Sequence, residues 1–229
     1  MPETTPQVLN HFALVRFTAA YWALAPAARR ERRDAWLARL HEASEALHLY
    51  QGFGLEAGLD LIVWTATRAA ETGVPAAFFR RLAAAYGPSR GDVEITHALW
   101  GVTRPSQYTK TRSTQELDPF APRALPYLVM YPFTKTSEWY LEPEEERRQM
   151  MFEHIKIGKQ YPEITQLLLY STGLQDQEFV VVYETEDLVK FSKLVTELRS
   201  TAARPYTLAD TPLHTAVRIE DAAELAAWL

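Results

Sequence analysis

The sequence predicts an α+β fold in which two ferredoxin-like units follow each other and stack as a dimeric α+β barrel. The element order β-α-β-β-α-β occurs in residues 1–104 and again in residues 125–229. Residues 105–124 between them are polar and rich in proline, which is typical of a connecting loop. Each unit would carry both helices on one face of its sheet, so the other face is free to stack on the second sheet.

The first half contains four strand-like and two helix-like segments. The long helix is predicted from apolar residues at helical spacing, and the short helix from a proline at its start and a Gly-Pro pair at its end. Glycines separate the two middle strands. The predicted elements are strand 11–20, helix 27–48, strands 49–55 and 59–67, helix 75–87 and strand 92–103.

The second half repeats this order and is expected to hold the functional site. Pro143 and the three glutamates after it favour the beginning of a helix, because carboxylates are stabilised at a helix N-terminus. The predicted elements are strand 124–133, helix 143–161, strands 166–171 and 178–184, helix 187–201 and strand 213–219.

Composition excludes several classes of function. An apolar content of 47% and a charged content of 23% are ordinary for a globular protein, and a net charge of -5 argues against a nucleic-acid partner. The chain has no cysteine, which excludes disulfides, thiolate nucleophiles and iron–sulfur clusters. No run approaches the roughly 20 apolar residues of a membrane span, and no leader pattern opens the sequence, so we expect a cytoplasmic protein.

His154 is the candidate that helical spacing singles out. It shares an apolar stripe with Met150, Ile157 and Tyr161, at spacings of four, three and four residues. A histidine on such a stripe is either a hydrogen-bonded core residue or a ligand. No second histidine stands four residues on, as in a zinc helix, whereas haem iron needs only one axial protein ligand. Gly158 would let a flat ring approach the backbone.

The motifs on either side of His154 favour the interpretation that it is a ligand. The segments YPFTKTSEWYLEPEEERRQMMFEHIKIGKQYP and YSTGLQDQEFVVVYET resemble the chlorite dismutase superfamily, and within it the coproheme decarboxylase branch. The resemblance is dense from about residue 127 to 215. In the first half the resemblance rests only on the pattern of predicted elements. In the connecting loop it rests on Ser106, Gln107 and Tyr108, which are similar to the family's segment for the haem propionates. It implies the duplicated ferredoxin-like fold and a homo-oligomer, commonly a pentamer.

The resemblance implies a role for several residues on the proximal side of the ring. His154 matches the iron ligand, Trp139 matches a tryptophan beside it, and Lys135 matches a lysine that joins a hydrogen-bond network with a glutamate. The position expected to hold that glutamate is Ala202. A carboxylate in such a network makes the imidazole a stronger donor, so its loss would raise the reduction potential of the iron.

Gln166 matches the distal position that distinguishes branches of the superfamily, where oxygen-evolving chlorite dismutases have arginine. A guanidinium is a permanent cation that can hold an oxyanion, whereas glutamine offers only neutral donors and an acceptor. The resemblance therefore disfavours chlorite chemistry. Without it, Gln166 would be interpreted as an exposed strand residue.

Tyr131 matches the tyrosine that forms a radical and abstracts hydrogen from a porphyrin propionate. A phenol suits this role because it is neutral at pH 7 and can yield a proton and an electron. From the residues alone, a strand tyrosine in the core is an equal alternative. Arg199 also matches a family position, and with Lys135 and the Ser106 to Tyr108 segment it is expected to bind propionates.

The resulting hypothesis is a haem-binding oxidoreductase, namely a peroxide-dependent coproheme decarboxylase that converts iron coproporphyrin (coproheme) to haem b. Its partners would be the iron porphyrin and hydrogen peroxide. One alternative keeps haem b as a cofactor of a peroxidase or an atypical chlorite dismutase-like enzyme. Others are a haem carrier or sensor without turnover, and a barrel of the same fold without haem.

Overall fold

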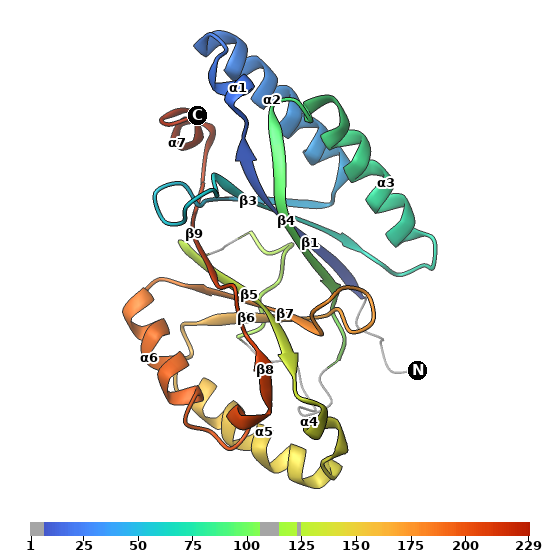
Figure 1. Cartoon of the computed structure of the whole chain (residues 1–229), viewed down its shortest axis with the longest axis vertical. Helices are drawn as coiled ribbons and strands as arrows, with labels where there is room; N and C mark the ends of the chain where they lie inside the picture. The colour runs from blue at the N-terminus through green and yellow to red at the C-terminus, as the bar shows by residue number, and fades with distance from the viewer. Residues whose placement is uncertain (1–6, 106–114, 123–124) are drawn as a thin grey trace. The chain divides into compact units, whose positions relative to one another are not determined.

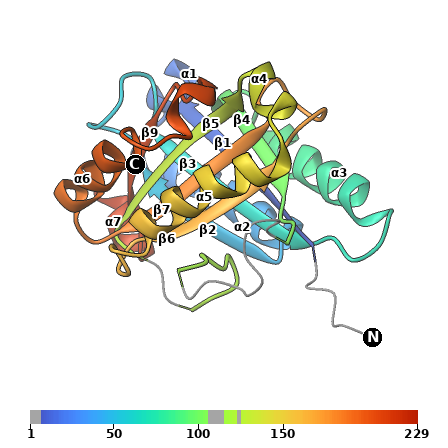
Figure 2. The ribbon, with the colours of Figure 1, turned by 90° about the horizontal axis from the view of Figure 1, so that it is seen from below.

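The computed structural model describes residues 7–105, 115–122 and 125–229. The chain divides into two compact units, Met1–Thr103 with Ala216–Leu229, and Arg104–Thr215. Each unit is α+β with antiparallel strands, which confirms the predicted fold class (Figures 1 and 2). No helix among the described residues is long and apolar enough to span a membrane.

The first unit is built on four antiparallel strands. Its strands are β1 (Val8–Phe17), β2 (Ala46–Gln51), β3 (Leu61–Arg68) and β4 (Val93–Val102), and they pair antiparallel in the order β4-β1-β3-β2. A later strand, β9 (His214–Arg218), pairs with β2 through Val217 and Arg218. The end of the chain thus extends the first sheet.

The helices of the first unit cover one face of its sheet. Figure 1 shows the two long helices, α2 (Pro26–Ala43) and α3 (Val74–Tyr86), on this face. Short helical segments are α1 (Ala19–Trp22), η1 (Gly87–Ser89) and α7 (Ala222–Ala226). The core between helices and sheet is fully apolar in its centre, with residues that include Leu9, Ala13, Val15, Trp36, Leu40, Leu61, Val63 and Phe78.

The helix predicted over 27–48 ends earlier, and this is a correction. It ends at Ala43, because Ser44 is extended and residues 46–51 pair with β3 instead. Leu47 fitted the helical spacing but belongs to the strand, so pairing with a neighbouring strand overrode the local pattern. Helix α1 was not predicted; the Thr18 hydroxyl accepts a hydrogen bond from the Tyr21 N–H at its start.

The second unit repeats much of this plan. Strands β5 (Tyr127–Lys135), β6 (Thr165–Tyr170), β7 (Phe179–Thr185) and β8 (Thr207–Ala209) are antiparallel in the order β6-β7-β5-β8. Figures 1 and 2 show α5 (Glu144–Gly158) and α6 (Leu188–Leu198) on the same face of this sheet. The short segments are α4 (Ser137–Leu141) and η2 (Arg204–Tyr206). The barrel, and the halves 1–104 and 125–229 joined by loop 105–124, stay predictions.

The two helices of the second unit differ in how they pack. Helix α6 buries Phe191 and Leu194 in a cluster with Val129, Tyr183 and other apolar residues of the sheet. Helix α5 has no fully buried residue along its length. Packing of apolar side chains therefore holds α6 on the sheet much more firmly than it holds α5.

We predict an acid-sensitive contribution to stability from His11 in β1. Burial lowers its pKa to about 4, whereas its pKa in an unfolded chain is about 6.5. The folded state thus binds fewer protons than the unfolded chain. The free energy of unfolding therefore has its full contribution from His11 above pH 6.5, and loses up to about 3 kcal/mol of it as the pH falls to 4. Urea unfolding at pH 7 and pH 4.5 should show a smaller acid loss in His11→Gln than in the parent protein. His97→Gln, on an exposed position of β4, should show the parental loss.

Candidate functional site

His154 lies on the side of α5 that faces the sheet. Ile157, three residues later, packs against the apolar cluster of the second unit, and residues three apart share a helix face. The pKa of His154 is lowered to about 4, mainly by burial and also by the charge of Lys135, while Glu153 acts in the opposite direction. The imidazole is therefore neutral at pH 7, which is the form that binds metals.

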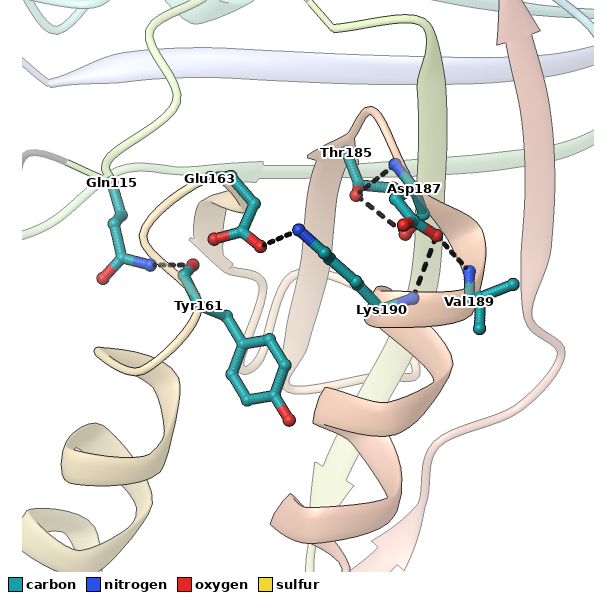
Figure 3. A network of polar contacts seen from close by, with 7 residues as sticks. All are labelled: Gln115, Tyr161, Glu163, Thr185, Asp187, Val189 and Lys190. Atoms are coloured by element: carbon teal, nitrogen blue, oxygen red, sulfur yellow. Dashed lines mark hydrogen bonds and ion pairs between the residues drawn. The ribbon is translucent and has the colours of Figure 1, made fainter.

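Gln115 anchors the end of α5. Its side-chain amide lies within hydrogen-bond distance of three carbonyl oxygens at and beyond the end of the helix, those of Gly158 at 3.3 Å, Tyr161 at 2.8 Å and Ile164 at 3.1 Å. Figure 3 shows the contact with Tyr161. The carbonyls of Gly158 and Tyr161 also accept hydrogen bonds from the backbone N–H groups of Tyr161 and Ile164, so the amide strengthens a turn that already follows the helix.

A second set of contacts fixes the start of α6 beside the same segment. The Lys190 ammonium lies 3.1 Å from the Glu163 carboxylate, so it joins α6 to the turn that follows α5 (Figure 3). The Asp187 carboxylate accepts hydrogen bonds from the N–H groups of Val189 and Lys190, and so caps α6. The ion pair is exposed and adds little stability.

The face of the sheet that α5 and α6 cover is apolar and only partly filled. The strand register aligns Tyr131 with Val181 and Leu168, and directly opposed residues point to the same face. Leu168 is 43% exposed although it lies within a strand on this face. Since α5 has no fully buried residue either, protein side chains do not close the layer at this place.

Tyr131 projects from β5 onto this face. Burial, followed by contact with Tyr183, raises its pKa well above 10, so the phenol is protonated at neutral pH. Its hydroxyl is hydrogen-bonded to that of Tyr183. Arg199 lies close enough to lower the pKa and Asp210 close enough to raise it. The structure thus brings Arg199, at the end of α6, to the surroundings of Tyr131.

Lys135 and Trp139 form a second group at the end of β5. The Lys135 ammonium lies 4.0 Å from the centre of the Trp139 ring, which is itself buried and packs on Tyr206. Burial lowers the pKa of Lys135 to about 8, with Arg204 acting in the same direction and Glu178 against it. Lys135 also acts on His154, so these residues share one electrostatic environment.

Glu178 is the acid that lies beside Lys135, and the sequence interpretation missed it. Its carboxylate accepts a hydrogen bond of 2.8 Å from the Lys135 N–H. Ala202, where a glutamate was expected, instead donates its N–H to the Glu153 carboxylate at 3.0 Å. The signal that could have identified Glu178 is its place next to Phe179, which pairs with Phe133, two residues before Lys135.

The remaining predicted site residues are less closely connected. Gln166 is exposed on β6 and pairs in register with Tyr183, while its backbone bonds to that of Gln115 and Leu117. Ser106, Gln107 and Tyr108 lie outside the described residues. Among the described residues, no group of three or more His, Asp or Glu side chains could hold a metal ion.

Comparison with known proteins identifies the family. The sequence model of chlorite dismutase matches residues 27–219, most of the chain. The chain belongs to the chlorite dismutase family. Within it, the coproheme decarboxylase of Mycolicibacterium smegmatis is 30% identical over 174 residues, which cover 75% of this chain and 72% of that protein.

Solved structures agree with this membership at the level of the fold. A chlorite dismutase from Candidatus Nitrospira defluvii, with an arginine changed to lysine, matches with a TM-score of 0.84 and 22% identity over 98% of this chain and 96% of its own. The same enzyme in complex with imidazole gives a TM-score of 0.82 and 22% identity over 96% and 94%. The family fold therefore extends over nearly the whole chain.

We predict that Gln115 contributes to the stability of this family member through the end of α5. Gln115→Ala removes the only side-chain amide described on those three carbonyls, and should lower the free energy of unfolding by about 1 to 3 kcal/mol. Gln160→Ala is the matched control, because Gln160 is exposed just beyond the same helix, and should change stability by less than about 0.5 kcal/mol. Urea unfolding measures both variants. If both lost the same free energy of unfolding, the anchoring role of Gln115 would be contradicted.

Proposed function

We propose that this member of the chlorite dismutase family is a peroxide-dependent coproheme decarboxylase, which converts iron coproporphyrin to haem b. The observation that carries the proposal is a protonated Tyr131 on the partly filled face of the second sheet, with Arg199 near enough for its charge to act on the phenol. Oxidation of a propionate requires a group that can lose its own hydrogen and then take one from the substrate, next to a cation that binds the carboxylate. The coproheme decarboxylase of Mycolicibacterium smegmatis, at 30% identity, supports this choice within the family.

The residues present fit an iron porphyrin. His154 offers a neutral imidazole on a helix that has no fully buried residue, and the sheet face that carries Tyr131 also leaves Leu168 exposed. A flat apolar ring can occupy such a layer, and one axial imidazole suffices for its iron. When bound, the iron porphyrin supplies the peroxide-dependent oxidising chemistry, and it is itself the substrate.

Tyr131 would carry the oxidation to the propionate. Its phenol gives up one proton and one electron, and then takes a hydrogen atom from the propionate side chain. Loss of a further electron and of carbon dioxide leaves a vinyl group. Each turnover is a two-electron oxidation, and those electrons with two protons reduce one hydrogen peroxide to two molecules of water. Two turnovers give haem b.

Cationic side chains would orient the four carboxylates of the substrate. Arg199 is near enough for its charge to act on Tyr131 and is 55% exposed, so its guanidinium can bind a propionate with two parallel hydrogen bonds. Lys135 is a further cation near His154. Orientation is the main contribution of the protein, because the propionate must lie in contact with the Tyr131 oxygen.

Gln166 favours this reaction over chlorite decomposition. It is exposed on β6, opposite Tyr183, and it is neutral, so it offers no permanent charge to an oxyanion. The predicted propionate contacts of Ser106, Gln107 and Tyr108 and the homopentamer also belong to this proposal.

The decisive prediction concerns the mass of the porphyrin. Iron coproporphyrin bound to the protein should lose two carboxyl groups when hydrogen peroxide is added, and Tyr131→Phe should abolish this loss because phenylalanine has no hydroxyl hydrogen to give. Mass spectrometry of the extracted porphyrin measures it. Tyr127→Phe, on the same strand, should retain the activity. An unchanged porphyrin mass with the parent protein would overturn the proposed function and favour a carrier or a haem b peroxidase.

A further prediction concerns the iron ligand. His154→Ala should remove the absorbance change that accompanies axial imidazole binding when ferric coproporphyrin is titrated into the protein, because no other side chain is assigned to the iron. His97→Ala should titrate like the parent protein, since His97 is exposed on β4 of the first unit. The same spectrum in both variants would show that another group binds the iron.

A further inference from the structure

We propose that Tyr183 is a positioning residue for Tyr131. Its hydroxyl accepts a hydrogen bond from the phenol of Tyr131, and turns to donate one when the Tyr131 oxygen has lost its hydrogen. The hydrogen bond is a property of the protein alone, and only the second half of the proposal rests on the proposed function. Tyr183 gains and loses no electron and no proton in this role.

The strand register places the two tyrosines together. Tyr131 is opposite Val181, and Tyr183 is opposite Val129, so the two are diagonal neighbours on the same face of paired strands. Their ring centres are 6.4 Å apart with an angle of 30° between the planes, and their hydroxyls are hydrogen-bonded. This arrangement directs both phenol ends to the same place on the face.

The surroundings hold the ring of Tyr183 still. It is 5% exposed, and Phe191 of α6 packs against it edge-on with ring centres 5.1 Å apart. In such a tightly packed ring the freedom that remains is rotation of the O–H bond. Tyr131 is less enclosed and lies on the partly filled part of the face.

The neutral phenol of Tyr183 can stay hydrogen-bonded to Tyr131 whether or not the Tyr131 oxygen carries a hydrogen. Each hydroxyl is at once a donor and an acceptor, and burial keeps both phenols protonated at neutral pH. In the proposed resting pair, Tyr131 is the donor and Tyr183 the acceptor. A Tyr131 oxygen without hydrogen can only accept, so Tyr183 must become the donor for the bond to persist.

Arg199, the cation near Tyr131, already forms an ion pair. Arg199 lies 3.7 Å from the Asp210 carboxylate, which also pairs with Arg204. In the proposed function Arg199 further binds a propionate. Tyr183 is therefore the described neutral group that can exchange donor and acceptor roles with Tyr131.

The first test needs no porphyrin. In protein labelled with ¹³C at the tyrosine Cζ, Tyr131→Phe assigns the Tyr131 signal. Tyr183→Phe should then shift that signal, because the hydroxyl loses its acceptor. Tyr161→Phe is the matched control: Tyr161 belongs to the same apolar cluster but its hydroxyl bonds to Glu197, so the Tyr131 signal should stay in place. An unshifted Tyr131 signal in Tyr183→Phe would overturn the hydrogen bond.

A measurement on the parent protein covers the case in which Tyr183→Phe does not fold. Hydroxyl hydrogens that are buried and bonded exchange slowly, so in equal parts of H₂O and D₂O the Cζ signals of Tyr131 and Tyr183 should each split. An unsplit Tyr131 signal beside a split Tyr183 signal would likewise contradict the pair.

The second test addresses turnover. Tyr183→Phe should lower the rate of decarboxylation roughly 2- to 10-fold, the effect of one neutral hydrogen bond, without changing KM for iron coproporphyrin. Tyr161→Phe should keep the parental rate. A parental rate in Tyr183→Phe would overturn the positioning role. A parent protein that leaves the porphyrin mass unchanged would instead overturn the proposed function, and the NMR result on the pair would still stand.

Discussion

The site depends on the hydrogen bonds between the Gln115 amide and the carbonyls at the end of α5. Helix α5 has no fully buried residue, so apolar packing alone does not determine where it lies over the sheet. Gln115 binds the carbonyls of Gly158, Tyr161 and Ile164, and so ties the end of α5 and the segment after it to one side chain near His154. A helix held at its end can leave apolar sheet surface such as Leu168 open, whereas a helix held by packing would cover it.

Two acids beside the site moderate its positive charges. Glu178 offsets part of the effect of burial on Lys135, and Asp210 lies between Arg199 and Arg204. Arg199 and Arg204 share the one acid Asp210, so one positive charge remains in that group, and the charge of Lys135 acts on His154. A ligand with several carboxylates complements such a site, because charge-assisted hydrogen bonds to carboxylates are among the strongest polar contacts. Family membership and charge thus support the same class of ligand.

Much of the fold followed from local patterns, and the exceptions have a common cause. The helix predicted over 143–161 is α5 with its last turn unwound, because Lys159 to Tyr161 form turns that Gln115 binds. The helix predicted over 27–48 lost its end to β2. Trp139 was placed by resemblance alone, and it lies in a short helix, α4, that the sequence did not indicate. Short elements such as this one are specified by contacts with distant segments rather than by periodicity.

The sequence by itself determined the element order, the side of α5 on which His154 lies, and the family, because periodicity and motifs are written along the chain. Tertiary structure decided which residues meet. The pairing of Tyr131 with Tyr183, and of Lys135 with Glu178, depends on the register between β5 and β7, whose residues are about fifty positions apart. A shift by one residue would turn each side chain to the other face, and no local pattern specifies that register.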